Sequence, residues 1–195
     1  MELYSRRGQN RQVMERSPRE IIDKYYPADS EVRGILITHS RMVASEALAI
    51  AARKGLDLDE VDIVAAAMLH DVGIVFTDAA GIGCFGQEPY IRHGVIGADL
   101  LRREGYPEKF ARVAERHTGA GLTAEEVLDR ELPLPADRSY MPETLLERLI
   151  CYADCFWSKP RPVERKTLER VRSSMARHGS AILGRFEALH KEFGD

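Results

Sequence analysis

The chain has 195 residues, of which 44% are hydrophobic and 30% are charged, and its formal net charge is −3 at pH 7. This usage is typical of globular proteins and excludes a disordered chain. The small negative charge argues against a global basic field for nucleic acid. No apolar run approaches the roughly 20 residues of a spanning helix, and the N-terminal residues lack the apolar stretch of a signal peptide. We therefore expect a cytoplasmic protein without a membrane partner.

Apolar residues recur at spacings of three and four along nearly the whole chain, and no stretch alternates as a half-buried strand does. The pattern predicts an all-α fold. Residues 1–16 are polar and basic and are predicted to form a flexible arm, whereas 17–195 are predicted to form one domain. Ser17 before Pro18 provides a cap and a first-turn proline for a helix that reaches about Tyr26.

A long helix is predicted from about residue 30 to Gly55, with His39 on its apolar stripe. Asp57 and Glu60 have the spacing of a capping box for the next helix, which carries His70 on its inner face. Both histidines should therefore point toward the core.

The stretch TDAAGIGCFGQEPY, residues 77–90, contains three glycines and a proline and is predicted to be an irregular loop at the substrate entrance. A helix carrying His93 should follow and end at Gly105, and the next helix should place His117 just before a break at Gly119.

The remaining helices follow a proline-rich connection, LPLPADRSYMP. The first carries Asp154 on its apolar face and ends at the sequence KPRP. Two amphipathic helices, over about 163–177 and 180–193, are predicted to close the chain and show no obvious chemistry.

Four of the six histidines lie on the inward faces of separate predicted helices, at or near helix ends. One such histidine is usually an ordinary core residue, but four together are unusual. Asp71 and Asp154 also lie in apolar stretches, where burial of an unpaired carboxylate would be costly. A cation would offset that cost. Imidazole and carboxylate ligands suit iron, zinc or manganese better than calcium, and six ligands are enough for two ions.

The order of these residues resembles the HD-domain superfamily of metal-dependent phosphohydrolases, in its six-ligand, two-metal form. The resemblance covers about residues 34–159. The adjacent pair in AAAMLHDVGI matches the signature of the family, and RHGVIGADLL, ERHTGAG and CYADCFWSK resemble its later motifs. It implies a single helical bundle with a metal site between core helices, a metal-binding core over about 34–159, and C-terminal helices over 163–193.

The resemblance also implies roles for particular residues. One divalent ion would be bound by His39, His70, Asp71 and Asp154, and the second by Asp71, His93 and His117. Asp71 would bridge the ions and act in catalysis, and iron is preferred to manganese or zinc. Lys159 would face a phosphate as a second catalytic residue. The alternative is that Lys159 is an ordinary solvated lysine at a helix end. Thr118, beside the fourth histidine, is a candidate for substrate binding.

One departure from the family concerns Ile74, which stands where many two-metal relatives carry a lysine shortly after the His-Asp pair. This weakens the case for a cyclic-dinucleotide phosphodiesterase. The candidates for contacting the substrate phosphate in its place are Arg41, Arg92 and Arg116, each of which also suits a surface ion pair. Phe85 and Tyr90 are candidates for stacking on a base or sugar, with a structural turn as the alternative.

The leading hypothesis is a metal-dependent phosphohydrolase that cleaves a phosphate ester or anhydride of a small phosphorylated metabolite, such as a nucleotide, with metal-bound hydroxide. The protein would then bind a small phosphorylated substrate and would have no extended surface for nucleic acid, and oligomerisation is left open. One alternative is a di-iron HD-domain oxygenase, because the same ligands can hold two irons that activate dioxygen. The other is a non-catalytic nucleotide sensor that uses the same pocket.

Overall fold

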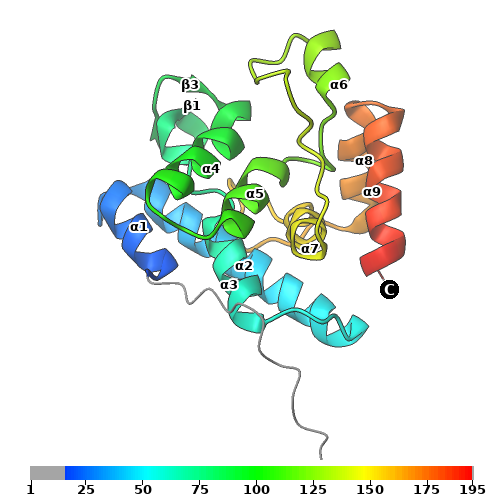
Figure 1. The fold of residues 1–195 in the computed structure, drawn as a ribbon, viewed down its shortest axis with the longest axis horizontal. Coiled ribbons are helices and arrows are strands. Elements are labelled where there is room, and N and C mark those ends of the chain that lie inside the picture. Colours follow the sequence, from blue (N-terminus) through cyan, green and yellow to red (C-terminus); the bar gives the residue numbers. More distant parts are fainter. Residues whose placement is uncertain (1–15, 195) are drawn as a thin grey trace, which may run out of the picture.

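The computed structural model describes residues 16–194, and over that range nine α-helices and one small sheet form the fold (Figure 1). The helices are α1 (Pro18–Tyr25), α2 (Glu31–Lys54), α3 (Glu60–Leu69), α4 (His93–Arg103), α5 (Glu108–Arg116), α6 (Ala124–Asp129), α7 (Leu145–Asp154), α8 (Leu168–Arg177) and α9 (Ser180–Phe193). The predicted all-α fold is confirmed. Nearly all of the predicted arm lies outside the described residues, and the domain boundaries stay a prediction.

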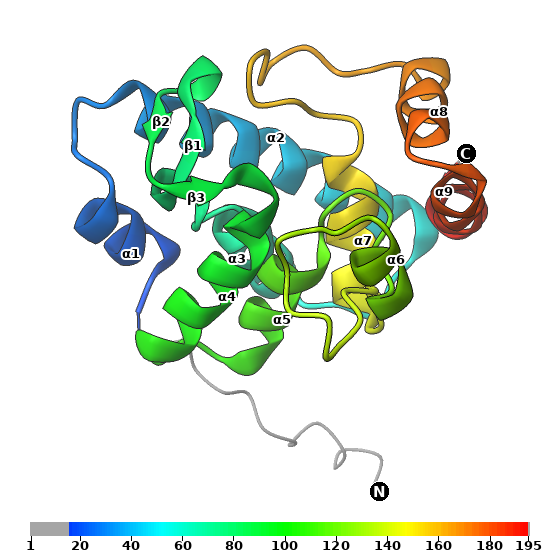
Figure 2. The same ribbon diagram turned by 90° about the horizontal axis from the view of Figure 1, so that it is seen from above.

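The long helix α2 is central to the fold and packs against α3 and α7 (Figure 2). It ends at Gly55, whose φ of 60° is the left-handed conformation that glycine adopts without strain. An 18-residue window of α2 has a mean hydropathy of 1.3, so by length and composition it is apolar enough to cross a membrane, contrary to our expectation from the sequence. Here its buried residues include His39, and it is a core helix.

The structure differs from the predicted elements at two helix starts. The cap of α3 is Asp59, which accepts a hydrogen bond of 2.9 Å from the amide of Val61, whereas Asp57 is exposed outside the helix. Helix α8 begins only after Thr167, about five residues later than predicted, because that hydroxyl caps the helix. Helix α6, within the segment before the proline-rich connection, was not predicted.

Residues 77–90 form a small sheet with strand order β2-β1-β3 rather than an irregular loop. Its strands are β1 (Thr77–Ala79), β2 (Cys84–Phe85) and β3 (Glu88–Pro89), with β1 antiparallel to β2 and parallel to β3. Strands of two or three residues are too short to show an alternating pattern in the sequence. Figure 2 shows the sheet beside α2, with β3 leading toward α4.

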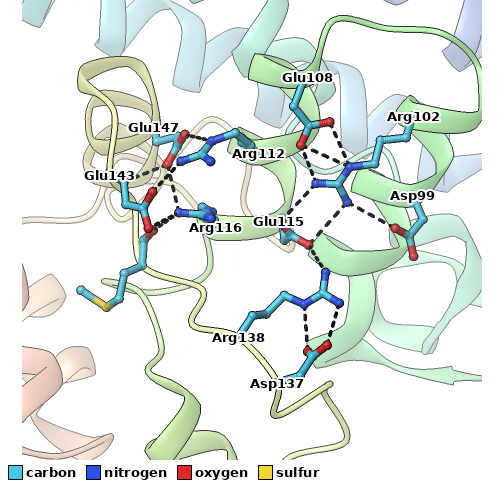
Figure 3. A network of polar contacts seen from close by, with 11 residues as sticks. Asp99, Arg102, Glu108, Arg112, Glu115, Arg116, Asp137, Arg138, Glu143 and Glu147 are labelled. Atoms are coloured by element: carbon cyan, nitrogen blue, oxygen red, sulfur yellow. Dashed lines mark hydrogen bonds and ion pairs between the residues drawn. The ribbon is translucent and has the colours of Figure 1, made fainter.

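A network of ion pairs holds α5 against its neighbours (Figure 3). Arg112 donates a 2.8 Å hydrogen bond to Glu147, whose side chain is 1% exposed, and Arg116 lies 3.8 Å from the same carboxylate. On the side toward α4, Arg102 lies 3.3 Å from the buried Glu115. These contacts fix the helix that ends at the fourth histidine of the predicted site.

Candidate metal centre

The structure brings all six predicted metal ligands together in two groups that share one aspartate. The first group is His39, His70, Asp71 and Asp154, and the second is Asp71, His93 and His117. Within each group the candidate donor atoms all lie within 4.8 Å of one another. The four histidines and Asp71 are buried. Their assignment as the ligands remains a prediction, which the chemistry of the donors supports.

Three of the histidines are oriented by the helix ends on which they lie. His70 and His117 are the C-caps of α3 and α5, and His93 is the C-cap of a short 3-10 helix, Tyr90–Arg92, that leads into α4. The Nδ1 of each lies against the backbone carbonyl three residues earlier. The distances are 2.6 Å from His70 to Ala67, 2.6 Å from His93 to Tyr90 and 2.8 Å from His117 to Ala114. The last carbonyls of a helix lack intrahelical partners and can only accept. In the neutral ring Nδ1 therefore carries the proton, which leaves the lone pair on Nε2.

In the second group, the Nε2 atoms of two of these histidines face each other. The Nε2 atoms of His93 and His117 are 3.0 Å apart, and when both rings are neutral neither has a proton to donate to the other. Two nitrogens that each lie about 2.1 Å from one ion, at an angle of about 90 to 100°, would be separated by roughly 3.0 to 3.2 Å. The spacing therefore fits a shared cation. In the first group, the Nε2 atoms of His39 and His70 are 3.2 Å apart.

Asp71 presents one carboxylate oxygen to each group. Oδ2 lies 3.2 Å from Nε2 of His39 and 3.0 Å from Nε2 of His70, whereas Oδ1 lies 3.4 Å from His93 and 3.3 Å from His117. Both oxygens are buried and neither accepts a hydrogen bond of normal geometry. The ammonium group of Lys159 lies 2.7 Å from Oδ2 and offsets part of the charge on that side. A buried carboxylate without hydrogen bonds is costly, and a cation in each group would stabilise both oxygens.

The two groups differ in their electrostatics. Burial opposes the protonation of His70, but the carboxylates of Asp71 and Asp154 raise its pKa to about 10. Burial lowers the pKa of His93 to about 3, and the neighbouring His117 acts in the same direction. Burial opposes the ionisation of Asp71, yet the charge on His70 holds the pKa of this carboxyl well below its usual range. A metal ion in the first group must therefore displace a proton from His70.

Lys159 lies at the edge of this cluster and is not a solvated lysine. Its side chain is 11% exposed, and its Nζ lies 2.7 Å from Oδ2 of Asp71. Burial opposes its charge, but the carboxylate of Asp71 raises the pKa of Lys159 well above its ordinary value. A lysine held in the protonated form suits contact with an anion better than proton abstraction.

A cavity of about 390 Å³ adjoins Lys159 and has the size of a small-ligand pocket. Two segments line it, with Ala79, Gly81, Ile82 and Tyr90 from one segment and Ser158, Lys159 and Pro160 from the other. The ring of Tyr90 stacks on His93, with centroids 4.7 Å apart. The segment 77–90 thus borders the space beside the metal centre.

Phe85 does not line this cavity, although we named it as a candidate for stacking on the substrate. The two residues of β2 point to opposite faces, so that Cys84 is buried and Phe85 is 81% exposed. The structure therefore gives Phe85 no contact with the candidate site.

The other candidates for substrate binding lie around the centre without a demonstrated role. Arg92 is paired with Glu88 at 2.5 Å, and Arg116 with Glu143 at 2.7 Å. Arg41 is exposed, and Thr118 is half-buried next to the fourth histidine. The ion pairs of the first two match the structural alternative, and all four roles stay predictions.

Two glycines that the sequence analysis overlooked allow the ligand-bearing elements to approach. A Cβ on Gly73 would lie 2.2 Å from the carbonyl oxygen of His93, and one on Gly94 would lie 2.6 Å from that of Ala114. The first contact brings Asp71 to the second group. The signal was present in the sequence, because each glycine lies within two residues of a ligand.

Several known proteins align with the chain. A tRNA (cytidine(56)-2'-O)-methyltransferase of Thermoplasma volcanium is 34% identical over 88% of this chain and 44% of its own length. An enzyme of the same name from Picrophilus torridus is 30% identical over 81% of this chain and 41% of its own length. An uncharacterized protein of Methanocaldococcus jannaschii is 41% identical over 52% of each chain. No solved structure matches the chain significantly.

The predicted enzyme class, a phosphoric ester or anhydride hydrolase, is wrong by this comparison. The two relatives that align with most of the chain are named as methyltransferases, which belong to a different class. This chain spans less than half of the length of either relative.

The HD domain model matches residues 36–156, more than half of the chain, and this range agrees with the extent of the motifs found in the sequence. The matched range includes all six predicted ligands. The helical fold and the cluster of buried histidines and aspartates, which supports the binding of divalent metal, agree with this match. The chain belongs to the HD-domain family.

Proposed function

We propose that the chain is a metal-dependent domain in tRNA modification, whose centre holds two divalent ions and binds a phosphate group of the RNA. The observation that carries the proposal is the 3.0 Å approach of Nε2 of His93 to Nε2 of His117. Both Nδ1 atoms lie against backbone carbonyls, so a cation shared by the two Nε2 atoms would satisfy both lone pairs. The opposite oxygens of Asp71 support a second ion in the first group.

The donor set suits iron, which we prefer, or manganese or zinc. When bound, such ions neutralise phosphate oxygens and lower the pKa of water. Lys159 is positioned to contact a further phosphate oxygen, because its ammonium group borders both Asp71 and the adjoining cavity. Tyr90 also lines that cavity, where its ring can contact a sugar or base, and the Lys159 ammonium group lies 5.8 Å from its ring centroid.

The names of two relatives support tRNA as the source of the phosphate. Because this chain spans 44% and 41% of those proteins, we assign it a phosphate-binding role rather than the methyl transfer itself. A cytoplasmic location is retained as part of the proposal.

The proposal can be tested by counting metals in protein purified without chelator. We expect two ions per chain in the wild type, a loss of both in Asp71→Asn, and no change in the control Asp78→Asn, whose carboxylate is exposed on β1. Two tightly bound ions in Asp71→Asn would contradict the shared ligand.

Ligand binding is measured next by calorimetry with cytidine and cytidine monophosphate. We expect the monophosphate to bind more tightly than the nucleoside, and to bind the metal-loaded wild type and control more tightly than the metal-free protein. Equal affinity for the nucleoside, or equal affinity of the metal-loaded and metal-free proteins for the monophosphate, would refute a role of the metals in phosphate recognition. A mixed-valence iron signal together with oxygen uptake would instead support the oxygenase alternative.

A further inference from the structure

The segment 158–177 has a charge opposite to that of the rest of the chain. It contains seven lysines and arginines and two glutamates, whereas the other residues comprise 21 basic and 29 acidic side chains. The segment begins four residues after Asp154, the last residue of α7, and includes all of α8. The net charge of the whole chain conceals this cluster.

Four of these basic residues surround a cavity of about 280 Å³. They are Arg161, Lys166, Arg170 and Arg177, and the remaining lining residues are Ser158, Pro160, Glu164 and Ser174. The single carboxylate cannot balance four cations. The walls of the cavity therefore carry a net charge of about +3 at neutral pH.

The pairing of these side chains shows where the excess charge lies. Glu164 is shared between Arg161 at 3.4 Å and Arg170 at 3.1 Å. Lys166 donates to a backbone carbonyl and Arg177 to a hydroxyl, and no carboxylate among residues 16–194 lies within ion-pair distance of either. Uncompensated guanidinium and ammonium groups around a hollow are suited to bind phosphate oxygens.

Two other arginines of the same segment provide a contrast. Arg165 pairs with Glu46 on α2, and Arg172 pairs with Glu187 on α9, each at 2.7 Å. Neither lines the cavity. These two arginines thus attach the segment to neighbouring helices, whereas four of its other five basic residues line the cavity.

The basic cavity lies next to the cavity beside the metal centre, because Ser158 and Pro160 line both. Lys159 lies between these two residues and contacts Asp71. A ligand with phosphates at regular intervals can therefore place one phosphate near the centre and another among the arginines. A polynucleotide has this form, whereas a mononucleotide has phosphates at one position only.

We propose that the basic cavity at the start of 158–177 binds a backbone phosphate of an RNA strand that passes the metal centre. The choice of RNA rests on the proposed function, but the binding of this phosphate requires no metal. The inference departs from our expectation, which remains untested, that the chain has no extended nucleic-acid surface.

The test compares Arg170→Gln/Arg177→Gln with Arg172→Gln, which removes a charge from the same helix but not from the cavity. Binding of a fluorescent tRNA transcript is measured by anisotropy over a range of salt concentrations, in EDTA. We expect the double variant to bind about tenfold or more weakly at 0.15 M salt, and its log–log salt slope to fall by about two. The control should change affinity less than about threefold, because its guanidinium is already paired.

Inorganic tripolyphosphate serves as the second probe and identifies the source of the phosphate. The proposal is overturned if the double variant loses tripolyphosphate binding but retains wild-type affinity for tRNA. It is also overturned if the control loses as much tRNA affinity as the double variant. Because the measurement is made in EDTA and repeated in Asp71→Asn, its result is independent of whether the chain binds two metals.

Discussion

Replacing Gly73 by alanine tests whether close backbone approach assembles the second group of metal donors. The φ of −85° and ψ of −8° at Gly73 are accessible to alanine, so the effect is steric rather than conformational. The new Cβ would lie 2.2 Å from the carbonyl oxygen of His93 and 2.6 Å from the amide nitrogen of Gly97. The turn and α4 must therefore separate by about 1 Å to restore van der Waals distances.

A separation of about 1 Å exceeds the roughly 0.2 Å tolerance of metal–ligand distances. We expect Gly73→Ala to lose the ion held by Asp71, His93 and His117 while it keeps the ion of the first group. Overpacking should cost about 1–3 kcal/mol, which a folded domain of this size can tolerate.

The assay combines metal counting with urea unfolding. The matched control is Gly184→Ala on α9, where a Cβ meets no atom within 4 Å and should stabilise the helix by about 0.5–1 kcal/mol. If Gly73→Ala retains two ions and wild-type stability, the close approach of the turn to α4 does not position the ligands, and the reasoning is refuted.

Three further outcomes are expected. In metal-free protein the folded pKa of His93, about 3, is below the unfolded value of about 6.5. The free energy of unfolding should therefore decrease as the pH falls through this window, by at most about 1.4 kcal/mol per pH unit. Urea unfolding of wild type and His93→Gln measures this effect, and identical pH dependences of the two proteins would contradict it. Phe85→Ala should change the free energy of unfolding by less than about 0.5 kcal/mol and leave ligand affinity unchanged, because the side chain is 81% exposed. Weaker ligand binding by this variant in calorimetry would support the predicted stacking role of Phe85. Arg112→Met should cost on the order of 2 kcal/mol, since it leaves the buried Glu147 without its closest cation, and the double variant with Glu147→Leu should recover most of this loss in urea unfolding.

The helices were predictable because their signals are local. Ser17 and Pro18 mark the start of α1, and Gly55 marks the end of α2, since a cap or a left-handed glycine acts within one turn. The small sheet was missed because its pairing joins β1 to β2 and β3 over strands too short to show a period. The sequence also placed the cap of α3 at Asp57, whereas the helix begins at Glu60 and is capped by Asp59.

The sequence by itself determined the identity and order of the six candidate ligands, from His39 to Asp154, and the helical class of the fold. It did so because buried histidines and aspartates are costly in an apolar face, so their repeated presence indicates a compensating cation. Only the tertiary structure decided how the donors are divided. The helix ends direct Nε2 toward the centre, and Asp71 presents one oxygen to each group. The placement of Phe85 and of the basic cavity was likewise decided by packing, because composition averages over surfaces that the fold separates.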